Sequence, residues 1–253
     1  MSKLLSIITV TRNDLHGLKS SFQSISNQNC SPDDFEWIVI DGDSNDGSVD
    51  YLQNLSPDFY YTYISEKDRG IFDAMNKGVK RISGQYLLFL NAGDILKNDY
   101  VLTNIFPYLK KESSKIVAGT VTCKWKDLSS NIKCLPWIPH QTAFIHRSCF
   151  RDQCYDSDMS FYGDLKFWMT LKAKGLFFPE RVDIEVAEFY MGGVGNNPRN
   201  IFKRLKERNK LGIAFNEPYL KAIARTLVFV SLYFTWKVLG LRYYYKLIMG
   251  TKN

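Results

Sequence analysis

Short apolar runs rich in β-branched residues alternate with helix-like segments over the first half of the chain. The runs are LLSIITV at 4–10, EWIVID at 36–41, YTYIS at 61–65 and YLLFLN at 86–91. Between them, apolar residues recur at helical spacing, which predicts helices after residue 15, over 47–55 and over 70–82. Continuous apolar runs are typical of strands buried on both faces, and strand–helix alternation is typical of a parallel sheet. We therefore predict a doubly wound α/β half over residues 1–120.

The pattern changes beyond residue 115. Short strands such as IVAGTV and QTAFIH precede a helix over 161–175, and a further segment leads to residue 195. A basic helix over 200–215, a break at Glu217-Pro218 and an aromatic-rich segment over 219–249 follow. The chain is therefore predicted to contain a domain over 1–195, divided into halves at 1–120 and 121–195, and a helical tail over 196–253.

The tail carries the net positive charge of the chain. Of 33 Lys and Arg and 26 Asp and Glu, residues 199–253 hold 12 basic and 2 acidic ones, so the body is mildly acidic. A basic tail is suited to nucleic acid or to an anionic membrane surface. The 5 cysteines form no C-x-x-C pair, and the first residues do not resemble a secretory signal. We expect reduced thiols and a body that stays in the cytoplasm.

Polar, mostly acidic residues follow three of the predicted strands, at 41–47, 65–68 and 91–94. The carboxyl ends of parallel strands form one crevice in which ligands bind. The sequence has no G-x-G-x-x-G or G-x-x-x-x-G-K-[ST] motif, so a phosphate would have to be held in another way. A carboxylate such as that of Asp94 can hold a divalent cation that in turn binds phosphate oxygens.

Five motifs, in this order and spacing, resemble those of family 2 glycosyltransferases: SIITVTRN, EWIVIDGDSNDGS, SEKDRGIFDAMNKG, YLLFLNAGD and GDLKFW. The resemblance covers residues 3–195, and NAGD in place of D-x-D is similar to the colanic-acid and O-antigen type of bacterial transferases. It implies the GT-A fold, a doubly wound, Rossmann-like mixed sheet flanked by helices. It also implies a nucleotide-diphosphate sugar donor, with UDP preferred, a divalent metal (Mn2+ or Mg2+) and inversion at the anomeric carbon.

The resemblance assigns roles to residues of this chain. On the donor side it implies Thr11 and Arg12 beside the nucleotide, Asp41 at the nucleobase, Asp43 in the same turn, and Asp68, Asp73 and Asn76. After the fourth strand it implies Asn91, Ala92 and Gly93 at the nucleotide sugar and Asp94 at the metal, with Asn91 replacing the first acid of D-x-D. Asp164 matches the catalytic base, and His140 and Gln141 fall where acceptor or diphosphate contacts are expected.

The acidic residues also have purely structural interpretations. An aspartate in the 41–47 turn or Asp94 can cap the following helix, and Asp164 can compensate a helix dipole. The Asn91 replacement leaves open an inactive family member that serves as a membrane-bound scaffold. A sugar nucleotidyltransferase is a second alternative, but residues 11–14 (TRND) do not supply the Gly- and Lys/Arg-rich loop that such an enzyme needs.

Apolar, aromatic and basic residues are mixed over 222–248, where the longest uncharged run, Thr226 to Trp236, has 11 residues. Spanning a bilayer takes about 20 residues, and this mixture is typical of a helix that lies in the membrane interface. We predict a peripheral protein on the cytoplasmic side of a bacterial inner membrane. Its acceptor would be a lipid-linked (polyprenyl diphosphate) saccharide of surface-polysaccharide biosynthesis, and no nucleic-acid partner is expected. The alternative is a tail packed on the domain or on a second subunit of a homo-oligomer.

Overall fold

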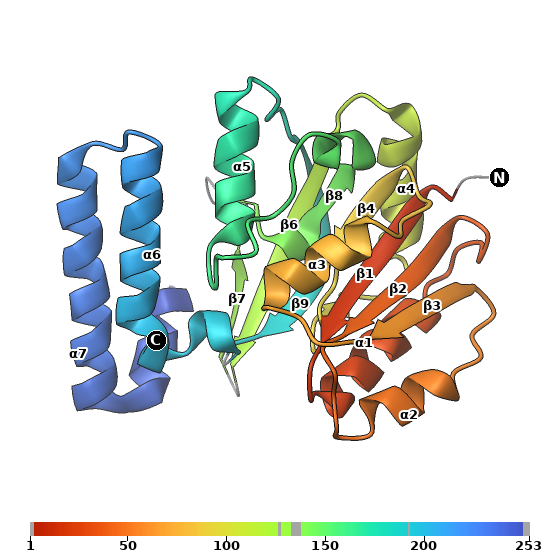
Figure 1. Ribbon diagram of the computed structural model, residues 1–253, viewed down its shortest axis with the longest axis horizontal. Coiled ribbons are helices and arrows are strands. Elements are labelled where there is room, and N and C mark those ends of the chain that lie inside the picture. Colours follow the sequence, from red (N-terminus) through yellow and green to blue (C-terminus); the bar gives the residue numbers. More distant parts are fainter. Residues whose placement is uncertain (1–2, 126–127, 133–137, 192, 250–253) are drawn as a thin grey trace.

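The computed structural model describes residues 3–125, 128–132, 138–191 and 193–249, which form one nine-stranded sheet with helices on both faces (Figure 1). The strands are β1 Leu5–Thr11, β2 Phe35–Asp41, β3 Tyr60–Ser65, β4 Tyr86–Phe89, β5 Ile95–Leu96, β6 Ile116–Trp125, β7 Leu128–Ile132, β8 Ala143–His146 and β9 Glu180–Tyr190. The helices are α1 Leu15–Ser26, α2 Ser48–Gln53, α3 Ile71–Val79, α4 Val101–Lys111, α5 Gly163–Ala173, α6 Ile201–Ala214 and α7 Tyr219–Met249. The 3-10 helices are His140–Thr142, Arg147–Phe150, Val194–Asn196 and Pro198–Asn200.

The order of the strands in the sheet is β3-β2-β1-β4-β8-β6-β9-β5, and β7 pairs with β6. Strands β3, β2, β1 and β4 are parallel to one another, whereas β8 runs antiparallel to both β4 and β6. β9 is parallel to β6 and antiparallel to the short β5. The predicted doubly wound, mixed sheet is therefore confirmed. Its entirely parallel part consists of β1 to β4, and the antiparallel pairs involve the later strands.

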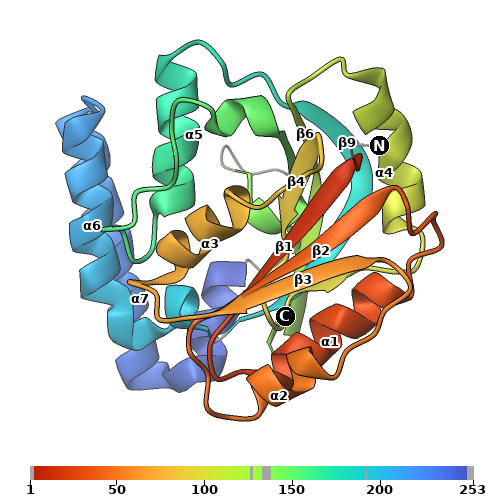
Figure 2. The ribbon, with the colours of Figure 1, turned by 45° about the vertical axis from the view of Figure 1, so that its right-hand side comes forward.

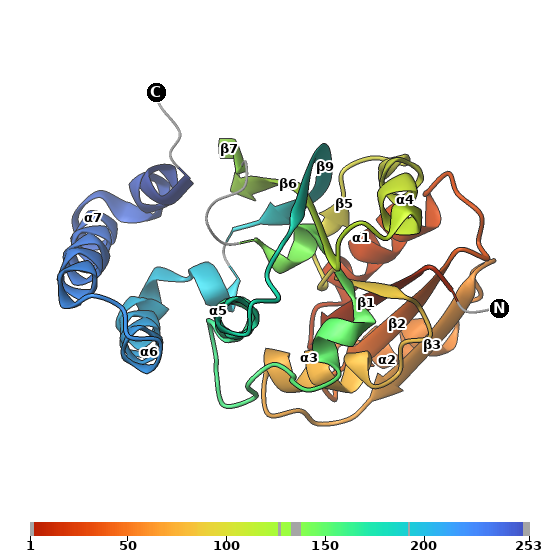
Figure 3. The ribbon, with the colours of Figure 1, turned by 90° about the horizontal axis from the view of Figure 1, so that it is seen from above.

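Both faces of the sheet are covered, which explains the continuous apolar runs in the sequence. Every residue of β1 is buried. Leu5 and Ile7 pack in one core cluster with residues of α1, α2 and α4, and Ile8 and Val10 pack in a second cluster with residues of α3 and α5. Figure 3 shows α3 and α4 on opposite sides of the sheet. A strand between two helical layers buries both of its faces, so its sequence cannot alternate with polar residues.

The fourth strand ends earlier than its apolar run predicts, at Phe89 instead of residue 91. The N–H groups of Leu90 and Ala92 still donate to carbonyls of β1, at 3.0 and 3.1 Å. Residues 91–94 thus form a loop held against the end of β1. The two-residue strand β5 that follows pairs with β9 and is too short for the sequence pattern to reveal.

The tail folds into a helical hairpin in which α6 and the first part of α7 lie side by side (Figure 1). Glu217, between the helices, binds Arg208 of α6 at 2.8 Å and Arg225 of α7 at 2.6 Å. Gly240 interrupts α7 with a φ of 84°, a backbone conformation that suits glycine. Beyond this break, Tyr244 and Tyr245 are buried in the core cluster that contains α1 and α4. The tail is therefore packed on the body at its end as well as at its start.

Helix α7 differs from the expectation drawn from its longest uncharged run, because by length and composition it can cross a membrane. Residues 219–239, before the break at Gly240, would extend over about 31 Å as a helix, close to the hydrocarbon thickness of a bilayer. The charged Lys221, Arg225 and Lys237 lie toward the two ends of this segment, and Arg225 is neutralised by Glu217. The longest uncharged run in the sequence is therefore shorter than the apolar part of α7.

Candidate active site

The first three strands end side by side, and their last residues are Thr11, Asp41 and Ser65 (Figure 2). Asp41 is fully buried, and its Oδ2 accepts hydrogen bonds from the Ser44 N–H at 2.9 Å and from Ser65 Oγ at 2.7 Å. Asp41 Oδ1 and Thr11 Oγ1 are buried without a hydrogen-bond partner among the described residues. A buried acceptor without a donor costs free energy, so Asp41 Oδ1 is suited to an N–H group of a ligand. The hydrogen bond from the Ser44 N–H also stabilises the turn after β2, which agrees with the purely structural interpretation of this aspartate.

Gly42 leaves room for the side chains of Arg12 and Asp68, which both lie close to it at these strand ends. A Cβ atom at position 42 would lie 2.5 Å from Asp68 Oδ2 and 3.3 Å from Arg12 Cβ and Cδ, so a side chain here would displace one of the two. Asp43, in the same turn, is exposed and has a φ of 62°. The structure thus brings together the charged residues predicted after the first three strands, and their contact with a nucleotide stays a prediction.

Asp73 and Asn76 of α3 use their polar atoms within the protein. The Asp73 carboxylate accepts from the Arg69 N–H at 3.1 Å and lies 4.0 Å from Lys77 Nζ. The hydrogen bond from the Arg69 backbone, and the charges of Arg69 and Lys77, lower the pKa of Asp73. Asn76 donates to the Tyr155 carbonyl at 2.8 Å and accepts from the Tyr155 N–H at 2.9 Å. Both residues hold neighbouring segments in place, and their contact with a donor stays a prediction.

The loop 91–94 is held by α1. The Asp94 N–H donates to the Asn91 carbonyl at 2.9 Å, and Gly93 has a φ of 88°. The buried Ser21 donates to the Asp94 carbonyl at 2.7 Å and accepts from the Gly93 N–H at 3.1 Å. Ser21 is not among the predicted site residues. Its signal in the sequence is a polar side chain on the apolar face of α1, three residues after Leu18.

The Asp94 carboxylate is buried next to His140 and Gln141. Burial raises the pKa of Asp94 to about 6, although the charge of His140 and a hydrogen bond from the Gln141 side chain act in the opposite direction. Asn91 Oδ1 is buried without a hydrogen-bond partner in the described part of the chain.

Asp94 and Asn91 fit a divalent metal that would take its other ligands from the substrate. A carboxylate and an amide oxygen are hard ligands of the kind that Mg2+ and Mn2+ bind, with phosphates and waters completing the coordination. Within the described ranges, no three His, Cys, Asp or Glu side chains are grouped so that they could hold a metal ion. A cation held by Asp94 and Asn91 would therefore depend on the diphosphate for its remaining ligands.

His140 connects this loop with the start of α5. Its Nε2 lies 3.0 Å from Asn91 Nδ2, and its Nδ1 lies 3.3 Å from Asp164 Oδ2. Because an amide nitrogen can only donate, this orientation of Asn91 makes Nε2 an acceptor and Nδ1 the donor to Asp164. Burial lowers the pKa of His140, but the hydrogen bond to Asp164 and the charges of Asp164 and Asp94 outweigh it, and the net shift is upward.

Asp164 lies in the first turn of α5, and its side chain is 25% exposed. Its Oδ1 accepts from the Leu165 N–H at 2.7 Å, and its Oδ2 faces His140. The preceding Gly163 packs on the Phe72 ring so closely that a Cβ atom would lie 2.7 Å from it. A carboxylate in the first turn of α5 compensates the helix dipole, as the structural interpretation expects. The same carboxylate is partly open to solvent beside the loop 91–94.

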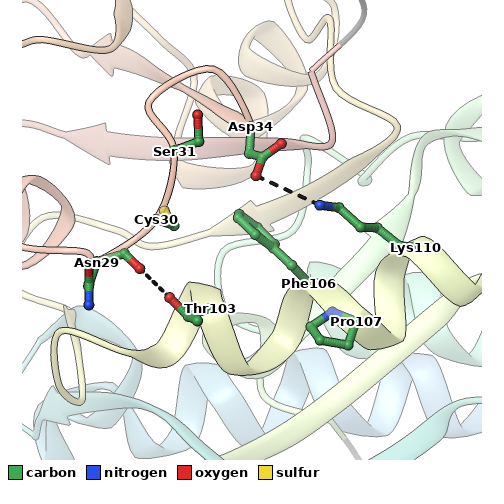
Figure 4. A pocket seen from close by; sticks show the side chains of 8 residues that line it. All are labelled: Asn29, Cys30, Ser31, Asp34, Thr103, Phe106, Pro107 and Lys110. Atoms are coloured by element: carbon green, nitrogen blue, oxygen red, sulfur yellow. Dashed lines mark hydrogen bonds and ion pairs between the residues drawn. The ribbon is translucent and has the colours of Figure 1, made fainter.

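A separate pocket lies between the loop 27–34 and α4, at the amino end of β2 (Figure 4). Asp34 and Lys110 lie 3.8 Å apart across it. Burial, followed by the charge of Asp34, raises the pKa of Cys30 to about 11, so this thiol is protonated at neutral pH. Ligands of doubly wound sheets bind at the carboxyl ends of the strands, whereas this pocket lies at an amino end. None of the predicted site residues lines it.

Comparison with known proteins identifies the family. The model of Glycosyl transferase family 2 matches residues 6–158. An uncharacterized glycosyltransferase of Mycobacterium tuberculosis is 30% identical over 225 residues, which cover 82% of this chain and 83% of that protein. A PGL/p-HBAD biosynthesis glycosyltransferase of Mycobacterium bovis is 28% identical over 231 residues, which cover 83% of this chain and 87% of the relative.

Solved structures confirm the GT-A fold. Staphylococcus aureus TarS in complex with UDP has a TM-score of 0.63 and 12% identity, over 92% of this chain and 71% of TarS. The mannosyltransferase PcManGT from Pyrobaculum calidifontis, in complex with GDP-Man and Mn2+, has a TM-score of 0.68 and 15% identity, over 99% of this chain and 80% of the other. The match to the family model covers more than half of the chain, which therefore belongs to glycosyl transferase family 2.

Proposed function

We propose that this glycosyltransferase moves a sugar from a nucleotide diphosphate to a hydroxyl group of a lipid-linked saccharide, with inversion at the anomeric carbon. The observation that carries the proposal is the contact series Asn91–His140–Asp164. It connects the loop that contains Asp94 with the carboxylate in the first turn of α5. A sugar whose diphosphate is bound at Asp94 would therefore have its C1 on the side of an acceptor hydroxyl bound at Asp164.

The donor nucleotide would bind at the carboxyl ends of β1, β2 and β3. Asp41 Oδ1 is a buried acceptor that needs a donor, and the N–H groups of uracil or guanine supply one. UDP is the preferred nucleotide, while Arg12 and the carboxylate of Asp68 would contact the polar parts of the donor beside Gly42. TarS was solved with UDP and PcManGT with GDP-Man, so both bases are found among proteins of this fold.

In the reaction, the acceptor oxygen bonds to C1 of the sugar as the C1–O bond to the diphosphate breaks. Asp164 would take the proton of the acceptor hydroxyl, because an alcohol is a poor nucleophile at neutral pH. His140 Nδ1–H, which donates to Asp164 Oδ2, would fix the direction of this carboxylate. Mn2+ or Mg2+ bound at Asp94 and Asn91 Oδ1 would stabilise the negative charge on the departing diphosphate. A single displacement with one base inverts the anomeric configuration.

The hairpin of α6 and α7 supports a membrane-bound acceptor. It exposes large apolar side chains, among them Leu220, Leu227, Phe234 and Val238. It also carries the net positive charge of the chain. Apolar surface with flanking cations binds membranes that contain anionic lipids. We place the enzyme on the cytoplasmic side of a bacterial inner membrane, where it would act in O-antigen, capsule or exopolysaccharide biosynthesis.

The test is release of nucleoside diphosphate from UDP-, GDP- and dTDP-sugars by the full chain. Each donor is offered with Mn2+, with Mg2+ and with a chelator, alone and with a polyprenyl diphosphate-linked saccharide. Metal-dependent release from one donor, increased by the acceptor, supports the proposal and identifies the nucleotide. No release from any donor with the acceptor present favours the inactive scaffold, which the Asn91 replacement suggests.

A further inference from the structure

Glu207 of the tail binds the segment that leads into the proposed catalytic base. Its Oε2 accepts from the Ser160 N–H at 3.0 Å, and its Oε1 accepts from the N–H groups of Phe161 and Tyr162, both at 2.8 Å. Asp164 follows two residues later. Three consecutive N–H groups on one carboxylate form charge-assisted hydrogen bonds, which are stronger than neutral ones.

Other contacts of α6 hold the same segment. Leu211 is buried in the cluster that contains Leu165 and Trp168 of α5. Arg204 forms a hydrogen bond with the Tyr162 side chain and another, at 3.4 Å, with Tyr244 Oη of α7. The segment 160–164 is therefore fixed by α6 on one side and, through Gly163, by α3 on the other.

We infer that Glu207 is a positioning residue for transfer, which holds the start of α5 so that the Asp164 carboxylate faces His140 and the acceptor. The inference rests on the proposed role of Asp164 as the base. It makes α6 a part of the catalytic unit, although the sequence places it in a separate tail beyond residue 195. The same helix contributes to the exposed apolar hairpin, so the element that meets the membrane also holds the base.

The inference is tested with the full chain carrying Glu207→Ala or Glu207→Gln, with Glu185→Gln as the matched control. Glu185 is a glutamate of β9 whose carboxylate accepts from Thr122 Oγ1 and lies 3.0 Å from Lys97 Nζ, so among the described residues its partners lie outside the segment 160–162. Displacing a reacting group by about 1 Å lowers rates by up to about 100-fold. We expect kcat of E207A to fall by about 10- to 100-fold and that of E207Q by less, because the amide keeps one acceptor oxygen. The KM for the donor and the Kd for the nucleoside diphosphate should stay within about twofold of the wild-type values, and E185Q should match the wild type.

A wild-type kcat in E207A, or a loss of nucleotide affinity as large as the loss of kcat, overturns the inference. Hydrogen exchange provides a readout that does not need activity. In E207Q the amides of residues 160–162 should exchange faster while those of β1 and β2 keep their protection, and unchanged exchange at 160–162 also overturns it. Asp164→Asn separates the two proposals: a wild-type rate in D164N shows that the assignment of the base is wrong, whereas an inactive D164N beside a fully active E207A refutes only the role of Glu207.

Discussion

His140 Nδ1 lies 3.3 Å from Asp164 Oδ2, and the same imidazole contacts Asn91 with its other nitrogen. The two proposed ends of the reaction, the diphosphate site at Asp94 and the acceptor site at Asp164, thus share one partly buried side chain. A histidine fixed by hydrogen bonds on both nitrogens holds its ring orientation and tautomer. The structure thus places His140 between the loop 91–94 and Asp164, whereas the sequence predicted only an acceptor or diphosphate contact for it.

Replacing Asp164 with Asn should abolish transfer without weakening donor binding. An amide cannot take the proton of the acceptor hydroxyl, and general bases contribute about 100- to 10,000-fold to such rates. We expect kcat to fall by at least about 100-fold, measured as sugar transferred to the acceptor. Nucleotide affinity, measured by calorimetry, should not change. The exposed Asp152 offers a control, because D152N should transfer at the wild-type rate; a D164N variant as active as D152N contradicts the assignment.

Replacing Asp41 with Asn should weaken nucleotide binding. The amide can keep its oxygen toward Ser44 and Ser65, but it then turns an NH2 group toward the base, where an acceptor is needed. Losing a hydrogen bond to a charged group costs about 1.5–3 kcal/mol, or about 10- to 100-fold in Kd. Calorimetric titration with UDP and GDP measures the change, with the exposed Asp50→Asn as control. Unchanged affinity in D41N would mean that the base does not bind at Asp41.

Most strands and helices of the body could be predicted from the sequence, because strands buried on both faces leave continuous apolar runs and amphipathic helices leave a periodic pattern. The residues after β1 to β4 could be placed at one edge for the same reason. The contacts of Asn91, His140 and Asp164 could not, since they join segments that are 49 and 24 residues apart. Nor could the sequence show that Glu207 binds residues 160–162, because its position on α6 resembles that of any exposed charge. For the same reason, the contacts between the tail and the body could not be predicted.

Exposed apolar residues of α7 should decide membrane binding. Leu227 and Val238 are 65% and 75% exposed. Burying one such side chain is worth about 1.5–3 kcal/mol, so the double variant L227E/V238E should bind vesicles with anionic phospholipid at least about tenfold more weakly. Phe178 is 75% exposed on the body and provides the control, since F178E should bind as the wild type does. Co-sedimentation measures both, and equal binding of L227E/V238E and the wild type would exclude this face as the anchor.

The ionised carboxylate of Glu188 should raise the free energy of unfolding at neutral pH and lose this effect at acidic pH. Burial raises the pKa of Glu188, but hydrogen bonds and charges from Lys124 and Lys97 outweigh it, so the pKa lies below its usual value. A carboxyl with a lowered folded-state pKa stabilises the protein above its unfolded pKa, about 4.3, and this contribution is lost as the pH falls through the folded-state value. In chemical denaturation, wild type and E188Q should therefore differ most at pH 6–7 and converge below about pH 4. A difference that grows toward low pH would contradict this assignment.

The most direct test of the account is nucleoside diphosphate release by the wild type, by Asp94→Ala and by the control Asp99→Ala, with Mn2+ and with a chelator. Asp99 is exposed in the loop before α4 and lies outside the site, so D99A should behave as the wild type does. We predict release that requires the metal and is lost in D94A, because the proposed metal site has one carboxylate. Equal release in the chelator, or an active D94A, would contradict a metal-assisted transfer centred on Asp94.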